Sequence, residues 1–221
     1  MKKRILLLAA IAVSAASFAQ QKTSFSVRGG YVSSNITGDA NQSLEGLMDF
    51  SNGAITTKNH TGFYAGGSVS VPLSTNFAIE SGLGYAQKGY TAKGELTIKG
   101  ASFLSPSAKA NLNLNYIEMP LLVKANFNGL ELFAGPQVAY LASAKLRTTA
   151  GALGFNVLDK TMDAADQFHQ WDAGVTGGVG YQFSNGLNLR ASYERGLTKV
   201  DSDRSFDAYN QAFKVGVGFR F

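Results

Sequence analysis

The sequence predicts an all-β protein: a transmembrane, up-and-down antiparallel β-barrel of eight strands that follows a cleaved signal peptide. Three observations predict this fold. The chain begins with the pattern of an export signal, eight later segments alternate apolar with polar or small residues, and long connections alternate with short ones. Alternation with a period of two turns one set of side chains toward lipid and the other toward the barrel interior.

Residues 1–19 are predicted to be a secretory signal peptide. A basic triplet at positions 2–4 precedes an apolar stretch at 5–13, and the sequence Ser-Phe-Ala at 17–19 has the small residues of a cleavage site. The apolar stretch is too short for a transmembrane helix. We therefore expect residues 20–221 to form one outer-membrane β-barrel domain.

Composition and charge exclude several classes of function. The basic triplet supplies three of the +5 formal charges, so the expected mature chain carries +2, and no basic run is interleaved with aromatic residues as in nucleic-acid-binding surfaces. The chain has no cysteine, and therefore no disulfide, thiolate nucleophile or Cys-bound metal. Its 25 Gly, 15 Phe and 9 Tyr are typical of barrels, where glycine permits close contacts and aromatic residues line the membrane interfaces. We expect no cofactor and no nucleic-acid partner.

Eight segments have the pattern of lipid-facing strands, which alternate over about ten residues. In the clearest one, Trp171, Val175 and Val179 share a face, and Asp172 and Thr176 lie on the other. The predicted strands are residues 25–31, 63–71, 77–86, 116–127, 130–141, 171–183, 187–194 and 213–221.

The connections indicate how the strands are joined. The short ones are residues 72–76, 128–129 and 184–186, and the long ones are residues 33–61, 87–115, 142–170 and 195–209. The Asn-Gly pair at 128–129 is a strong hairpin signal. Strict alternation of long and short connections is typical of an up-and-down barrel with short periplasmic turns and long outer loops. Residues 90–99 also alternate and are expected to extend a strand above the membrane. A ten-stranded barrel is the alternative if residues 87–115 contain a hairpin of their own.

The inward faces of these strands carry nine charged residues. An eight-stranded barrel is just wide enough to be filled by side chains, and charges removed from water need partners. We therefore expect an internal salt-bridge network that plugs and stiffens the barrel, and a gated polar path for ions or small solutes is the alternative. The predicted network consists of Arg28, Glu80, Glu118, Lys124, Asp172, Arg190, Glu194, Lys214 and Arg220.

One segment resembles a known family. Residues 116–124, Tyr-Ile-Glu-Met-Pro-Leu-Leu-Val-Lys, are similar to a motif of the outer-membrane β-barrel domain family that is common in Bacteroidetes, whose members are labelled porin family or PorT family proteins. Ala-Gly-Pro at 134–136 and the glycine-rich stretch at 172–180 also match its pattern. The resemblance implies an outer-membrane location, in contact with outer-membrane lipid, and it identifies no ligand.

The last predicted strand ends in aromatic residues. Phe213, Phe219 and Phe221 share one face, which resembles the C-terminal signal read by the barrel-assembly machinery. That machinery is the expected partner during biogenesis. The long loops are the expected surface for an extracellular ligand, and a closed barrel with no unpaired strand edge is expected to be a monomer.

No enzyme site is predicted. His60 and His169 are the chain's two histidines, and both lie in or beside long connections, without a partner at a spacing that catalysis requires. We expect both to be surface residues. The favoured interpretation is a non-enzymatic barrel with a structural or surface-interaction role. The alternatives are a narrow channel or a PorT-like accessory of protein secretion, and then a membrane-embedded lipid-modifying enzyme.

Overall fold

The computed structural model describes residues 22–38, 55–95, 107–152, 155–200 and 208–221. The predicted signal peptide at 1–19 lies outside the described residues. Among those described, no helix is long and apolar enough to span a membrane. The elements are β1 (Ser24–Thr37), β2 (Ile55–Pro72), β3 (Phe77–Glu95), β4 (Ser107–Phe127), β5 (Leu130–Ala152), β6 (Phe155–Asp163), the 3₁₀ turn η2 (Ala165–Gln167), β7 (Trp171–Gln182), β8 (Leu187–Gly196) and β9 (Tyr209–Arg220).

Eight of these strands form a closed antiparallel ring. Each strand pairs with the next along the chain, β5 pairs with β7, and β1 pairs with β9 to close the sheet. Closure matters in lipid because an unpaired strand edge there would leave backbone groups without hydrogen-bond partners. The predicted eight-stranded, up-and-down barrel is confirmed.

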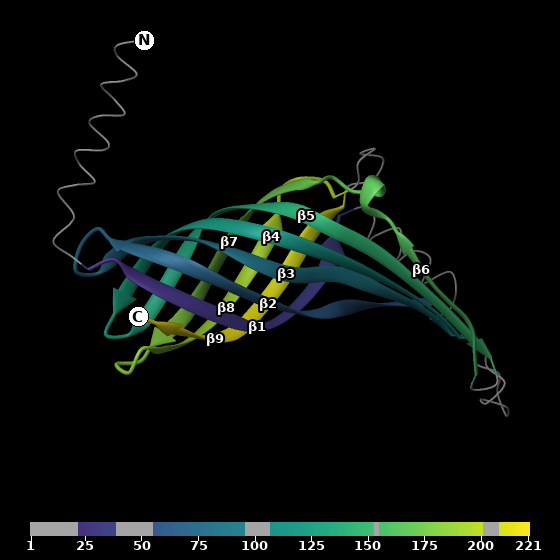
Figure 1. Ribbon diagram of the computed structural model, residues 1–221, viewed down its shortest axis with the longest axis horizontal. Coiled ribbons are helices and arrows are strands. Elements are labelled where there is room, and N and C mark those ends of the chain that lie inside the picture. The colour runs from purple at the N-terminus through teal and green to yellow at the C-terminus, as the bar shows by residue number, and fades with distance from the viewer. Residues whose placement is uncertain (1–21, 39–54, 96–106, 153–154, 201–207) are drawn as a thin grey trace, which may run out of the picture.

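Two long connections contain extensions of the strands that border them. β3 and β4 continue pairing with each other as far as Glu95 and Ser107, so the described part of residues 87–115 lengthens these two strands and adds none to the ring, as the expected extension at residues 90–99 had indicated. Within residues 142–170, β5 runs on to Ala152 and pairs with a ninth strand, β6, which stands outside the ring. These extensions carry β2–β5 well past the other strands, toward the right of Figure 1.

The barrel has an apolar outer surface and a polar interior. Leu83 is 60% exposed on the outside of β3, whereas Glu80 on the same strand is 1% exposed. Exposed apolar side chains surround the ring, among them Phe25, Val123 and Val217. In water such a surface would cost free energy, since burial of apolar area is the main driving force of folding. It is the surface expected of a barrel surrounded by hydrocarbon.

The short connections are tight hairpins at the end of the barrel where the C-terminus lies (Figure 1). Asn128 and Gly129 have φ values of 51° and 91°. Two consecutive positive φ angles are the requirement of a type I′ turn, which the Asn-Gly pair satisfies with the least strain.

Ring closure depends on a backbone contact at Gly216. A Cβ atom built there would lie 2.4 Å from the carbonyl oxygen of Gly29 and 2.4 Å from the hydroxyl of Tyr64. We expect Gly216→Val to reduce strongly the fraction of protein that folds, because overpacking costs about 1–3 kcal/mol or more where backbone atoms cannot move aside. The measurement is the change in gel mobility on boiling, and the outward-facing Val217→Leu is the control. A wild-type folded fraction for Gly216→Val would contradict this reading of the β1–β9 seam.

Candidate functional site

The charged groups of the barrel interior gather in two clusters. The first surrounds Glu80 on β3, near the short-turn end. Its carboxylate accepts hydrogen bonds from Nη1 of Arg28 at 2.6 Å, from Arg190 at 2.8 and 3.2 Å, and from Nζ of Lys124 at 3.2 Å. Four strands of the ring, β1, β3, β4 and β8, thus converge on one buried carboxylate.

Glu131 on β5 is the second acid of this cluster. It lies 3.0 Å from Nζ of Lys124 and 3.6 Å from Arg190. Arg220 is 4.0 Å away, and its side chain is 36% exposed, so it belongs to the rim of the cluster. The guanidinium of Arg190 also lies 4.0 Å from the ring centre of Phe133, a cation–π contact that covers its remaining face.

The second cluster is a square of two acids and two bases nearer the outer end. Lys88 lies 2.6 Å from Glu118 and 2.9 Å from Glu194. Lys214 lies 2.6 Å from Glu194 and contacts Glu118 as well. All four side chains are almost fully buried. Opposite charges thus alternate around the square, the arrangement that best compensates the desolvation of buried ions.

Asp172 lies apart from both clusters. Its carboxylate accepts a hydrogen bond of 2.7 Å from Nδ2 of Asn210, and the same amide donates to the hydroxyl of Tyr116 at 3.0 Å. This chain of contacts links β7, β9 and β4 just below the outer end of the ring.

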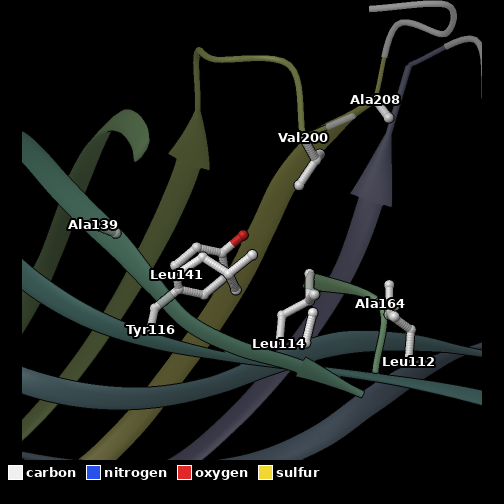
Figure 2. Packing of buried hydrophobic residues seen from close by; sticks show 9 residues of the cluster. Leu112, Leu114, Tyr116, Ala139, Leu141, Ala164, Val200 and Ala208 are labelled. Carbon is white, nitrogen blue, oxygen red and sulfur yellow. The ribbon is translucent and has the colours of Figure 1, made fainter. Parts of the chain in front are cut away.

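An apolar cap covers the outer end of the interior. Figure 2 shows side chains of β4 and β5 together with Ala164, which follows β6, and with Val200 and Ala208, which lie between β8 and β9. Tyr116 and Leu114 are fully buried in it, and Tyr90, Leu146 and Phe168 pack against it. We call this set the cap: Leu112, Leu114, Tyr116, Ala139, Leu141, Ala144, Ala164, Val200 and Ala208.

All nine residues of the predicted interior network lie on inward faces. Seven make close ion pairs, Arg220 reaches the rim, and Asp172 is hydrogen-bonded to Asn210. Two members of the clusters were missed. Lys88 fell in a stretch assigned to a loop, and Glu131 shares the face of Phe133, which the alternation of β5 could have indicated. The aromatic residues Phe213, Phe219 and Phe221 lie on the outer surface, and their role as an assembly signal stays a prediction.

The two histidines differ from each other. His169 is half-buried and donates its backbone N–H to the carbonyl of Val200 at 2.9 Å. His60 was expected at the surface but is 8% exposed. It pairs with the buried Ser34 of β1, and its imidazole lies beside Gly89. Burial lowers the pKa of His60, and the nearby charge of Lys109 lowers it further. Within the described residues, no group of three His, Cys, Asp or Glu side chains could hold a metal ion.

An antiparallel ring with an apolar outside and a charged, desolvated inside defines a transmembrane β-barrel. A family model described as outer membrane protein beta-barrel domain matches residues 18–202, and the chain belongs to this family. It is therefore an outer-membrane protein. A comparison with curated proteins found no match.

Several solved structures resemble this one in fold. Neisserial surface protein A is 12% identical, with a TM-score of 0.47, and the match covers 91% of this chain and 100% of that one. Ail, the attachment invasion locus protein of Yersinia pestis, is 14% identical, with a TM-score of 0.46 and the same coverage. The outer-membrane protease OmpT of Escherichia coli is 11% identical, with a TM-score of 0.40, and 90% of this chain and 96% of that chain are covered. At these identities the likeness concerns the fold alone.

The Glu80 cluster predicts a large stability effect. Glu80→Gln leaves Arg28, Arg190 and Lys124 with one fewer carboxylate, and removing one partner of a buried ion pair costs about 3–5 kcal/mol. We expect the urea midpoint of the detergent-solubilised protein to fall accordingly. Arg147→Gln is the control, because it breaks an exposed pair with Asp159 that lies outside the barrel, and its midpoint should not change. Equal urea midpoints for the two variants would contradict the predicted contribution of Glu80 to the stability of the barrel.

The environment of His60 predicts its titration. With histidine-selective labelling the protein gives two imidazole signals, and His60→Gln assigns them. We expect His60 to titrate below the usual pKa of histidine, and Lys109→Gln to raise the midpoint part of the way, because burial, the larger cause, remains. A His60 midpoint at or above the usual pKa of histidine, about 6.5, would contradict the burial seen here.

Proposed function

We propose that this protein is a closed, non-conducting outer-membrane barrel. The barrel anchors at the cell surface the part of β2–β5 that extends beyond the ring. Two features support the proposal. The ring encloses ion pairs and an apolar cap instead of an open lumen, and β2–β5 continue beyond the ring on the side away from the short turns. Short turns face the periplasm in barrels of this kind, so the extension points outward.

The observation that carries the proposal is the double closure of the interior. An ion that entered from the outer side would first meet the cap, whose Leu112, Leu114 and Tyr116 have no more than 2% of their surface exposed. It would then have to separate the ion pairs of Lys88 and Lys214. The square and most of the cap are built from strands of the ring, so movement of the connecting segments that carry Ala164, Val200 and Ala208 would remove neither obstacle.

A narrow channel is the second candidate, and one cavity favours it. A space of about 90 Å³ is lined by members of both clusters, including Arg28, Glu118 and Arg190. A cavity of this volume has room for several water molecules. It would become part of a path only if the square and the cap opened together.

The remaining parts of the proposal concern class and partners. The motif at residues 116–124 supports a place in the porin or PorT branch common in Bacteroidetes, which includes a possible accessory role in secretion. We propose that the protein is not an enzyme: among the described residues, the buried His60 has no carboxylate in hydrogen-bond contact, although a protease shares the fold. The closed ring supports a monomer, and the aromatic C-terminal strand supports recognition by the barrel-assembly machinery.

The test is single-channel recording of the purified, heat-modifiable protein in planar bilayers. We expect no conductance steps from a sample that inserts, with insertion verified by protease protection of the barrel and a general porin recorded as the positive control. Steady conductance that changes in Glu118→Gln or Arg190→Gln would overturn the proposal, since the interior clusters would then gate a path.

A further inference from the structure

The extension beyond the ring carries a groove lined by cations. It has a volume of about 380 Å³ and lies across β2, β3, β4 and β5. The cross-strand register builds its floor, because Lys58 is opposite Thr91, Thr91 is opposite Asn111, and Asn111 is opposite Arg147. The next row brings Lys93 directly opposite Lys109. We call this site the basic groove.

The basic groove lacks the counter-charges found in the interior. Of its four cations, Arg147 is held by Asp159 on β6, with Oδ2 at 2.6 Å. In the part of the chain that the structure describes, no carboxylate lines the groove, and Lys58, Lys93 and Lys109 form no ion pair. Like charges directly opposite each other on neighbouring strands are destabilising. The Lys93–Lys109 pair therefore favours an anion bound between its members.

A second observation also indicates a ligand at this place. His60 lines the groove, its side chain is more than nine-tenths buried, and its Nε2 has no hydrogen-bond partner among the described residues. Buried polar atoms in proteins nearly always have a partner. An acceptor oxygen in the groove would provide one, and its negative charge would favour the protonated imidazole beside Lys109.

The position of the groove indicates the kind of anion. Along β4, Asn115, Asn113, Asn111 and Lys109 continue the lipid-facing side of Ile117, while the residues between them point into the cap. Asn111 is six residues beyond Ile117, which is about 20 Å along a strand and about 15 Å in height at the usual tilt. The polar layer of a phospholipid leaflet is only about 5–8 Å thick. The groove thus lies above phospholipid head groups, at the level of the sugars of a surface glycolipid.

We propose that the basic groove binds a phosphorylated or otherwise anionic saccharide. Lys58, Lys93 and Lys109 provide the charge, His60 provides a buried hydrogen-bond donor, and Asn111 and Asn113 provide amides suited to sugar hydroxyls. The outer-leaflet glycolipid is the source that the lipid-facing side favours, and a soluble anionic glycan has the same chemistry. The inference goes beyond the proposed function and holds whether or not the barrel conducts.

The first experiment measures binding of a fluorescent core oligosaccharide, released from lipopolysaccharide with its phosphates intact, to the protein in detergent. We expect saturable, salt-sensitive binding that is lost when the oligosaccharide is dephosphorylated. In Lys93→Gln/Lys109→Gln the Kd should rise about tenfold, which corresponds to the loss of two modest charge contacts. The matched control is Lys145→Gln/Lys160→Gln, because it removes the same charge from exposed lysines of β5 and β6 that do not line the groove. Its Kd should change less than twofold.

The second experiment uses the His60 signal as a local reporter in lipid nanodiscs. Lipopolysaccharide with a phosphorylated core should raise the pKa of His60, whereas phospholipid alone should not. A shift in such nanodiscs without a response to free oligosaccharide would assign the site to the glycolipid, and a response to both would assign it to anionic sugars from either source. Absence of any response to both the free oligosaccharide and the lipopolysaccharide nanodiscs would overturn the proposal. Equal weakening in both double variants, or unchanged binding after dephosphorylation, would overturn it as well. Heat-modifiability verifies that every variant is folded.

Discussion

The pairing of β1 with β9 is the constraint on which the rest of the structure depends. It turns an open sheet into a ring, and in hydrocarbon only a closed ring gives every backbone N–H and C=O a partner. The seam is tight because Gly30 and Gly216 face each other beneath the ring of Tyr64. Closure also fixes the size of the lumen, and an eight-stranded lumen leaves room for side chains and little else.

The narrow lumen explains the arrangement of the interior charges. Charged residues on inward faces are shielded from bulk water, so each must find an opposite charge or a hydrogen bond. Glu80 meets this requirement with three cations, and Glu118 and Glu194 meet it with two lysines that they share. Because every partner comes from a different strand, the clusters tie distant parts of the ring together. The cap then closes the outer end, mainly with apolar contacts.

The charged residues of the extension are arranged differently from those inside the ring. Among the residues that the structure describes, the lysines inside the barrel are all within ion-pair distance of carboxylates, whereas Lys93 and Lys109 face each other with no carboxylate nearby. Water and salt can screen such charges outside the membrane, which is why the fold tolerates them there. Screening does not explain why four cations and a buried histidine share one groove. The proposed anionic ligand would explain this arrangement. The protein thus combines a membrane anchor whose interior charges are paired with an outer groove whose lysines have no carboxylate partner among the described residues.

The sequence by itself determined the parts of this protein that follow from alternation. A strand between lipid and a filled lumen must be apolar on one face and polar or small on the other, so the pattern located the eight strands, the short turns and the nine inward charged residues. Above the membrane this requirement ends, and Leu112, Leu114 and Tyr90 point into a cap while polar residues face outward. Alternation there distinguishes strand from loop less clearly. Residues 90–99 were recognised as a strand extension, but the extensions of β2, β4 and β5, the strand β6 and Lys88 were missed.

Tertiary structure alone decided which charges meet. Lys88 and Glu194 are far apart in sequence, and their contact depends on how far each strand is shifted against its neighbour around the closed ring. Lys58, Lys93, Lys109 and His60 come together in the same way, through the register of four strands. A local pattern states which face a side chain occupies. Its height in the barrel, and hence its partner, is set by hydrogen bonds between strands that the local pattern does not contain.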